Sequence, residues 1–482
     1  MGIKFCEASL NPRPQFWSNA KIVNMRKDYL SLILLLGLIS IAATIDIDDL
    51  FLYSELEAPN YIDADNTPEG NPITDEGATL GRVLFYDKQL SLDGTISCSS
   101  CHHQEFAFGD TATQSIGMNG NTGRHSMRLV NARFSDESRF FWDERAATLE
   151  DQVTMPIQDH IEMGFSGEDG DPDFDSLTTR LSEIDYYQVL FPLAFETLEI
   201  TEEKVQMALA QFIRSIQSFD TSFDEGLAQV NNINNPFPNF SNQENLGKQL
   251  YLLPPPDGGA GCAGCHSPPE FSIDPLSLNN GVVGVAGAEG ETDLTNTKAP
   301  SLRALINPNG VENGPFMHDG SLLSLAEVID HYNLIPPNPQ NTNLDIRLQG
   351  PPLNLNNAEK AALEAFLITL SGSEVYTAEQ WSDPFDENGN LDLIGGTTNI
   401  EGPIDNVSKT KVYPNPFQDY FIIESDLERF QVEFYNLNGA MVKQITASSG
   451  ERINSADLPN GVYLLKVSST NAKVQTVKVM KY

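Results

Sequence analysis

Cys-Ser-Ser-Cys-His at residues 98–102 and Cys-Ala-Gly-Cys-His at residues 262–266 are the two stretches that decide the fold. Two cysteines separated by two residues and followed at once by a histidine form the attachment signature of c-type haem. The thiols add to the two vinyl groups of the porphyrin, and the histidine reaches the iron as its proximal ligand. We therefore expect two covalent haem c groups. Their attachment residues are Cys98, Cys101, Cys262 and Cys265, and their proximal ligands are His102 and His266.

Other uses of paired cysteines are open at this point. A zinc site needs four ligands, which two Cys-x-x-Cys pairs could supply. A redox dithiol of the thioredoxin type also uses this spacing. Neither use requires a histidine directly after both pairs. The fifth cysteine, Cys6, lies far from both motifs in the sequence.

The motifs lie in a long and strongly acidic chain. Its 482 residues indicate several domains, and a hydrophobic content of 40% is enough for a sizeable core. Lys and Arg total 29 against 67 Asp and Glu, which gives a formal net charge of -38. Such a surface repels nucleic acid and anionic lipid, and it favours a basic protein partner or a small neutral substrate. A solvated surface suited to a salty habitat would account for the same charge.

The N-terminal 45 residues have the composition of an export signal. Lys21, Arg26 and Lys27 precede an apolar run over residues 30–43, and small residues follow. A basic stretch, a short apolar stretch and small residues form a secretory signal peptide. The run is short for a membrane span, which needs about 20 apolar residues, although an uncleaved anchor is the alternative. Met25 is a second candidate for the start of translation.

The middle of the chain is predicted to be mainly helical. Thr201 is placed to begin a helix, and Ser241 with Glu244 and Asn356 with Glu359 form capping boxes before two more. Residues 230–240, rich in Asn and Pro, indicate a linker. The predicted units are an N-terminal haem c domain over 46–229, a C-terminal haem c domain over 230–382 and a linker over 383–409.

Residues 410–482 have a different pattern, with short alternating strands. Asn438-Gly439 and Asn460-Gly461 mark turns between strands, and a small β-sandwich fits these signals. The text YPNP at 413–416, YNLNG at 435–439 and LPNGVY at 458–463 resembles the C-terminal sorting domain of the type IX secretion system. The resemblance implies export to the periplasm and then, through the type IX machinery, to the cell surface or the medium. A β-module that binds carbohydrate or another partner is the alternative.

Longer signatures surround the haem motifs. They are LGRVLFYD at 80–87, FWDER at 141–145, APSLR at 299–303 and PFMHDGSLLSLAEVIDHYN at 315–333. In this order they resemble the bacterial di-haem cytochrome c peroxidases, including the MauG-like branch, over residues 60–372. The resemblance implies a mainly α fold with two c-type cytochrome domains in tandem, followed here by the β-sandwich sorting domain.

The resemblance also implies roles for residues near the first haem. That haem would be peroxidatic, with Glu162 at the position of the family's distal carboxylate and Gln152 at that of a distal amide. Trp142 matches the tryptophan that lies between the haems. Each residue also has a structural alternative. Glu162 could be a solvated surface acid, Gln152 a polar group on a helix surface, and Trp142 a core side chain.

The axial position of the second haem separates the branches of the family. Tyr332 stands where MauG-like members have a tyrosine and the peroxidases have a methionine, so we expect Tyr332 to bind the iron. Met317 and His331 are rival ligands, and His318 is expected to support a haem propionate or the domain interface. A phenolate stabilises ferric iron and lowers the reduction potential.

Two departures from the family pattern bear on the cofactors. Met118 occupies the position of a distal histidine found in members that need reductive activation. We expect a five-coordinate first iron that reacts without prior reduction, with Met118 as the alternative, weak ligand. His125 replaces an asparagine that helps bind calcium between the domains, which argues against calcium as a further cofactor.

The resulting functional prediction is a di-haem peroxidase. Hydrogen peroxide would be reduced to water at the first haem, with electrons from a small cytochrome or other redox protein entering through the second. The alternatives are a MauG-like oxidase of a protein or organic substrate, an electron carrier without catalysis, and a structural or adhesive surface protein. Members of the family often pair, so a homodimer is a candidate assembly.

Overall fold

The computed structural model describes residues 50–136, 139–386, 389–391, 393, 411–413, 417, 420–425, 429–436, 441–459, 461–469 and 472–481. The expected signal peptide and residues 394–409 of the expected linker lie outside them. The chain divides into two compact units, Met1–Gly396 and Thr397–Tyr482. None of the helices in the described residues has the length and apolar character needed to cross a membrane.

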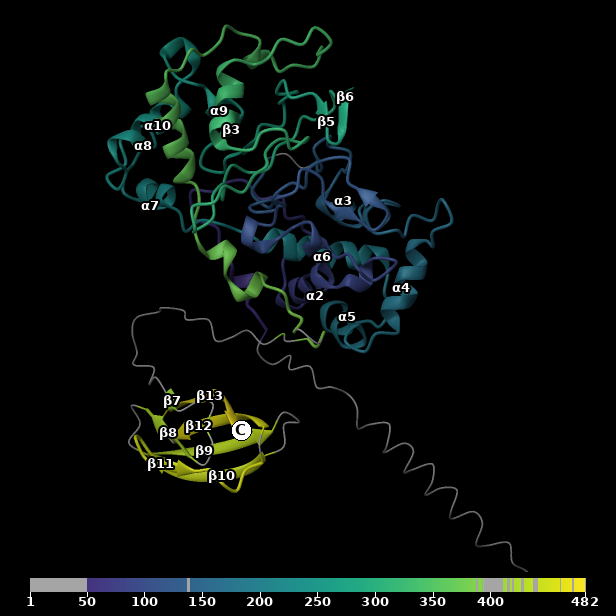
Figure 1. Cartoon of the computed structure of the whole chain (residues 1–482), viewed down its shortest axis with the longest axis vertical. Coiled ribbons are helices and arrows are strands. Elements are labelled where there is room, and N and C mark those ends of the chain that lie inside the picture. The colour runs from purple at the N-terminus through teal and green to yellow at the C-terminus, as the bar shows by residue number, and fades with distance from the viewer. Residues whose placement is uncertain are drawn as a thin grey trace, which may run out of the picture. The chain divides into compact units, whose positions relative to one another are not determined.

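The first unit contains two hydrophobic cores, and each lies beside one cysteine motif. Helices α2–α6 surround the N-terminal core and α7–α10 the C-terminal core (Figure 1). The N-terminal helices are α2 (Asp75–Tyr86), α3 (Leu149–Thr154), α4 (Phe174–Ser182), α5 (Tyr187–Phe195) and α6 (Glu202–Ser215). The C-terminal helices are α7 (Ser222–Ala228), α8 (Asn242–Leu252), α9 (Leu325–Asn333) and α10 (Asn357–Ile368).

Short paired strands join these helices. They are β1 (Ile116–Gly117) with β2 (Gly120–Asn121), β3 (His266–Ser267) with β4 (Ser272–Ile273), and β5 (Gly284–Val285) with β6 (Ala288–Thr292), all antiparallel. The three predicted helix starts are confirmed: Thr201, Ser241 and Asn356 are the N-caps of α6, α8 and α10. Their side-chain oxygens accept hydrogen bonds from N–H groups of the first turn, which have no partner within the helix.

A close crossing of two helices occurs in the same way at each of the two cores. A Cβ atom at Gly81 of α2 would lie 2.0 Å from the carbonyl oxygen of Ala208 on α6. A Cβ atom at Gly247 of α8 would lie 1.9 Å from the carbonyl oxygen of Ala362 on α10. Only glycine fits at such a distance, so Gly81 and Gly247 are structurally equivalent. In the sequence, both glycines follow a leucine.

The segment after α10 returns to the N-terminal domain. Trp381 is buried in the N-terminal core, and its carbonyl oxygen accepts a hydrogen bond of 2.7 Å from the Tyr86 hydroxyl. Leu391 and Leu393 also pack there. The structure therefore departs from the predicted boundary at 382, because apolar side chains on both sides of it complete the first core. The predicted linker over 230–240 also buries side chains in the second core, including that of Phe237.

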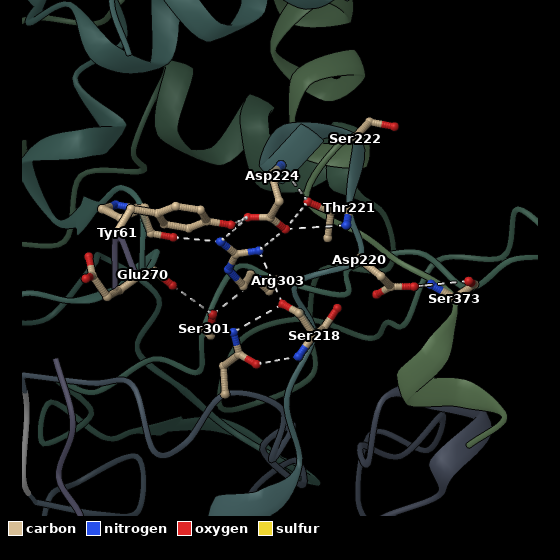
Figure 2. Close-up of polar contacts among 12 residues, drawn as sticks. Tyr61, Ser218, Asp220, Thr221, Ser222, Asp224, Glu270, Ser301, Arg303 and Ser373 are labelled. Carbon is tan, nitrogen blue, oxygen red and sulfur yellow. Dashed lines mark hydrogen bonds and ion pairs between the residues drawn. The ribbon is translucent and has the colours of Figure 1, made fainter. Parts of the chain in front are cut away.

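A buried ion pair connects α7, the loop that carries Arg303 and the segment before α2 (Figure 2). Both terminal nitrogens of Arg303 donate to Asp224 at 2.9 Å. The Tyr61 hydroxyl donates to the same carboxylate at 2.8 Å. Arg303 also donates to the carbonyl oxygens of Ser218 and Pro269. Removing one member of such a buried pair costs about 3–5 kcal/mol, so this network holds these three segments together.

The second unit contains two antiparallel sheets around one core. One sheet has the order β10-β9-β12-β13 and the other β11-β8-β7. The strands are β7 (Lys411–Tyr413), β8 (Tyr420–Glu424), β9 (Arg429–Asn436), β10 (Met441–Ser448), β11 (Arg452–Asn454), β12 (Gly461–Ser469) and β13 (Ala472–Lys481). Phe421 on β8, Val432 on β9 and Leu465 on β12 pack in the core that the two sheets share. Asn438, Gly439 and Asn460, the predicted turn residues, lie outside the described residues.

Candidate active site

The first Cys-x-x-Cys-His motif lies at the wall of the N-terminal core. Cys98 begins the 3-10 helix Cys98–Ser100, and Cys101 and His102 follow it. The Nδ1 atom of His102 is 3.0 Å from the carbonyl oxygen of Phe108, so Nδ1 carries the proton and Nε2 keeps its lone pair. Burial lowers the pKa of His102 to about 4. The imidazole is therefore neutral, as iron binding requires.

The cysteines lack the features of the two alternative sites. Burial raises the pKa of Cys98 and of Cys262 to about 12, whereas a reactive dithiol needs a lowered pKa. Cys98 packs against the N-terminal core and Cys262 against the C-terminal core, so the pairs do not converge on one zinc ion. Among the described residues, no group of three His, Cys, Asp or Glu side chains is placed to hold a metal. The geometry favours neither a dithiol nor a shared zinc site.

A small cavity of about 70 Å³ brings the first motif together with the predicted distal residues. Apolar side chains, among them Phe85 and Leu209, form part of its wall. The chemically active groups that line it are Cys98, Cys101, His102, Gln152 and Glu162. Residues more than 60 positions apart in the sequence thus face one cavity.

A small hairpin fixes the backbone that carries Glu162. The N–H of Met118, at the turn between β1 and β2, donates to the Glu162 carbonyl oxygen at 2.9 Å. The next N–H, from Asn119, donates to the Ile161 carbonyl oxygen at 3.0 Å. A Cβ atom at Gly117 would lie 2.3 Å from that same oxygen, so the hairpin can approach only because residue 117 is glycine. These contacts hold Glu162 at the cavity.

The Glu162 side chain titrates near neutral pH. Burial raises its pKa, the negative charge of Asp159 adds to the rise, and Arg145 opposes it, so that the pKa is about 7. A carboxyl group with such a pKa can accept and return a proton under physiological conditions. The environment of Glu162 therefore differs from that of an exposed surface acid.

Gln152 is positioned by the short helix α3. Glu150, in the first turn of α3, forms two hydrogen bonds with the buried Arg214 of α6, at 2.6 and 3.0 Å. Asn71 also donates to Glu150 at 2.8 Å. This network anchors α3 on α6 and turns Gln152 toward the cavity that Glu162 lines.

The Met118 side chain does not line this cavity. Its terminal methyl group packs beside Gly164, where an added Cβ atom would be 2.4 Å from it. The neighbouring Gly117 lines the first cavity, whereas Met118 is not among the lining residues. The structure thus does not bring the Met118 sulfur together with His102.

The second motif faces a much larger cavity of about 1020 Å³. Cys262, Cys265 and His266 line it together with many apolar side chains. Burial lowers the pKa of His266 to about 4, so this imidazole is also neutral. The Tyr251 hydroxyl donates to the His266 carbonyl oxygen at 2.6 Å and fixes the backbone at the motif.

Asn280 contacts all three candidate axial ligands of the second site, but it contacts His331 through its backbone rather than its side chain. Its side-chain nitrogen lies 3.3 Å from both the Tyr332 hydroxyl and the Met317 sulfur, and both residues line the cavity. The Nε2 atom of His331 is instead 2.9 Å from the Asn280 carbonyl oxygen, and His331 is not among the lining residues. The geometry keeps Tyr332 and Met317 as candidates and turns His331 away. Burial raises the pKa of Tyr332 to about 12.

Trp142 lies at the junction of the two haem domains. Its indole N–H donates to the carbonyl oxygen of His125 at 2.8 Å. Its own carbonyl oxygen accepts from the N–H groups of Thr297 and Lys298, in the C-terminal domain. The indole packs edge-on against the His318 ring at a centroid distance of 6.3 Å and lines the second cavity. Trp142 is thus fixed from both domains.

The comparisons with known proteins place the chain. Residues 75–232 match the family model described as di-haem cytochrome c peroxidase. The methylamine utilization protein MauG of Methylophilus methylotrophus is 30% identical over 349 residues, which cover 71% of this chain and 95% of that protein. The chain belongs to the di-haem cytochrome c peroxidase and MauG family.

Other relatives agree with this assignment. The cytochrome c551 peroxidase of Nitrosomonas europaea is 27% identical over 320 residues, 64% of this chain and 82% of that protein. The crystal structure of a MauG-like protein associated with microbial copper homeostasis is 29% identical, has a TM-score of 0.55, and covers 68% of this chain. The match spans 99% of the chain in that crystal structure. Residues 411–481 match the family model of a secretion system C-terminal sorting domain, which confirms the predicted sorting domain.

Membership of this di-haem family implies two c-type haems, and the residues at both sites suit them. Each site offers two free thiols and a neutral histidine. The second cavity, at about 1020 Å³, has room for a porphyrin. The first cavity, at about 70 Å³, is smaller than a porphyrin.

An arginine bridges the two domains near the position where the family resemblance placed calcium. Arg124 donates to Asp293 and to the Asn296 side chain, both at 2.8 Å, and forms an ion pair of 3.1 Å with Asp143. His125, which follows it, is buried and uses Nδ1 to bond the Ala112 carbonyl oxygen. The guanidinium thus supplies a positive charge to both acids.

Sequence reasoning missed two residues of this site. Ser126 lines both cavities and so lies between the two haem positions. It belongs to the segment 124–128, whose departure from the family pattern was the only signal available. Asn280 contacts both candidate axial ligands from a loop without any recognisable motif, so no sequence signal could have found it.

Proposed function

We propose that this protein reduces hydrogen peroxide to water at the first haem, with electrons that enter through the second. The observation that carries the proposal is Glu162, a half-buried carboxyl group with a pKa of about 7 that lines the same cavity as His102. A carrier of electrons alone has no use for an acid-base group at that position.

Two side chains would have separate roles in the reaction: Glu162 would transfer the proton and Gln152 would orient the peroxide. His102 would hold the haem iron, which would supply the electrons needed to reduce peroxide. The ionised Glu162 takes a proton from the near oxygen of peroxide and returns it to the departing oxygen. Gln152, on the same cavity, is placed to hydrogen-bond the peroxide and orient it. Two electrons from the donor and two protons from solvent complete the reduction of one peroxide to two waters.

Trp142 would shorten the electron's path between the haems. Its ring lines the second cavity, and its N–H is bonded to the backbone next to Ser126, which lines both cavities. Backbone hydrogen bonds to both domains keep the ring in one place. A small redox protein is the proposed donor.

Replacing Glu162 with glutamine tests the proposal. We expect Glu162→Gln to lose most peroxide turnover while retaining both haems, as measured by steady-state peroxide consumption and the pyridine haemochrome. Glu168→Gln, which changes an exposed acid six residues away, is the matched control and should retain full turnover. Unchanged turnover in Glu162→Gln would remove the basis of the proposal.

A second candidate function is favoured by Tyr332. This residue lines the second cavity, and tyrosine is the residue that the resemblance places there in MauG-like oxidases. Such an enzyme would use the oxidising power generated at the first haem on a protein or organic substrate. Peroxide consumption with a panel of reduced donors distinguishes the two: rapid turnover with a reduced cytochrome supports the peroxidase, and slow turnover with every donor supports the oxidase.

The sorting domain supports a proposal for location. We infer that the protein crosses into the periplasm and then leaves the cell through the type IX machinery, for the cell surface or the medium. Deletion of residues 410–482 in a host with this machinery should leave the haem protein in the periplasm. Normal surface delivery of the truncated protein would contradict the inference.

A further inference from the structure

Arg128 is a buried cation whose charge has no carboxylate partner in the described part of the chain. Only 7% of its surface is exposed. Its terminal nitrogens reach the carbonyl oxygens of Asn313 and Ser301 only at 3.4 Å, at the outer limit for a hydrogen bond. Its Nε atom is buried without a hydrogen-bond partner. Burial lowers the pKa of Arg128 to about 10, which reflects the cost of keeping this charge away from water.

Two other buried arginines of the same unit have the carboxylate partner that Arg128 lacks. Arg214 pairs with Glu150 at 2.6 Å, and Arg303 pairs with Asp224 at 2.9 Å. A buried charge without a partner costs several kcal/mol, and proteins ordinarily compensate it with an opposite charge. The position of Arg128 therefore indicates that an anion arrives from outside the polypeptide.

The surroundings of Arg128 indicate the chemical class of this anion. Arg128 lines the large cavity that Cys262, Cys265 and His266 also line. It follows Ser126, which lines both cavities, so it lies on the side of the second cavity toward the first domain. A planar guanidinium matches a carboxylate through two parallel hydrogen bonds.

We propose that Arg128 binds a propionate carboxylate of the second haem. The thioether bonds join the vinyl side of the porphyrin to the C-terminal domain, and Arg128 would bind the opposite, propionate side from the N-terminal domain. The second haem would thus be held by both domains, with its propionate side directed toward the first haem. This inference rests on haem attachment at the second site but not on peroxide reduction.

Arg347 offers a matched control in the wall of the same cavity. It lines the cavity as Arg128 does, but it already pairs with Asp274 at 2.6 Å and Asp345 at 2.8 Å. Loss of either positive charge should lower the reduction potential of the second haem. Only loss of Arg128 should also shift the infrared bands of the propionate. This difference distinguishes a direct contact between Arg128 and the propionate from a general effect of charge.

The test compares the holoprotein with its Arg128→Gln, Arg128→Lys and Arg347→Gln variants. Haem labelled with ¹³C in the propionate carboxyl groups allows redox-difference infrared spectra to report the propionates as each haem is titrated. We expect Arg128→Gln to shift the propionate bands of the second haem and to change its oxidised-to-reduced equilibrium at least tenfold, which is 59 mV for one electron. Arg128→Lys should change the reduction potential of the second haem less than Arg128→Gln does. Arg347→Gln should leave the propionate bands in place.

Two results would overturn the proposal. One is an unchanged propionate band in Arg128→Gln that still contains two haems by the pyridine haemochrome. The other is an equal band shift in Arg347→Gln. The label separates a propionate from a free carboxylate anion, since only the former carries ¹³C. If the wild-type protein contained no covalent haem, the cofactor assignment itself would be refuted. That result differs from the two results that would overturn the role of Arg128.

Discussion

Glu162→Gln should make the folded protein more stable at alkaline pH, although it removes most of the proposed activity. The reason is that the fold keeps Glu162 away from water and near the negative charge of Asp159. Both effects disfavour the ionised carboxylate. Glutamine has nearly the same shape and no charge, so it avoids this cost. A residue retained for its chemistry would thus be a residue that weakens the fold.

The magnitude follows from the pKa. Glu162 has a pKa of about 7, against 4.5 for an ordinary glutamic acid. One pKa unit is worth about 1.4 kcal/mol, so ionising Glu162 costs about 3 kcal/mol more in the folded protein than in the unfolded chain. Between these two pKa values the folded protein holds a proton that the unfolded chain has released. The free energy of unfolding therefore falls as the pH rises through this window.

Urea unfolding, followed by circular dichroism, measures this difference. Relative to the wild type, Glu162→Gln should gain up to about 3 kcal/mol at pH 8 and almost nothing at pH 4, where both folded and unfolded wild type are protonated. Glu168→Gln, at an exposed position, should match the wild type at both pH values. An equal gain at pH 4 and pH 8, or no gain at pH 8, would refute the reasoning, because neither can come from an acid with a raised pKa.

Three further results are expected. Wild-type kcat/KM for peroxide should fall about tenfold per pH unit below pH 7, because Glu162 must be ionised to accept a proton, and a pH-independent profile would contradict this. Trp142→Phe, which loses the hydrogen bond to the His125 carbonyl oxygen, should slow stopped-flow electron transfer between the haems with both still bound. Gly81→Ala and Gly247→Ala should each cost about 1–3 kcal/mol in urea unfolding, since the new methyl group meets a carbonyl oxygen at about 2 Å, whereas Gly70→Ala has open space.

The sequence predicted the local features of the fold better than its long-range packing. Capping residues such as Thr201 and Ser241 mark helix starts because their hydrogen bonds are made within one turn. The return of Trp381 to the first core could not be predicted, because it depends on a space left by helices far away in the sequence. The equivalence of Gly81 and Gly247 was missed for the same reason: its cause is a carbonyl oxygen on another helix.

The candidate site also contains local features that the sequence predicts and long-range features that it does not. The haem motifs could be read directly because one cofactor fixes the spacing of adjacent residues. Glu162 could be placed only through the family resemblance, since its role depends on a cavity built from separate segments. Asn280 and Arg128 carry no motif at all. Their significance lies in what surrounds them: two candidate ligands in one case, and a missing counter-charge in the other.

One scaffold can serve two haem chemistries because the shared and the distinct parts come from different segments. In each domain a glycine lets two helices cross closely, and the cysteine motif lies beside that pair. The opposite wall is built from loops, which can change without disturbing the crossing. In the first domain a hairpin holds Glu162 there, while in the second Asn280 holds Tyr332 and Met317. An acid-base group at one site and candidate iron ligands at the other would separate the proposed peroxide chemistry from the proposed electron entry. Trp142, fixed from both domains, then has a defined place between the two.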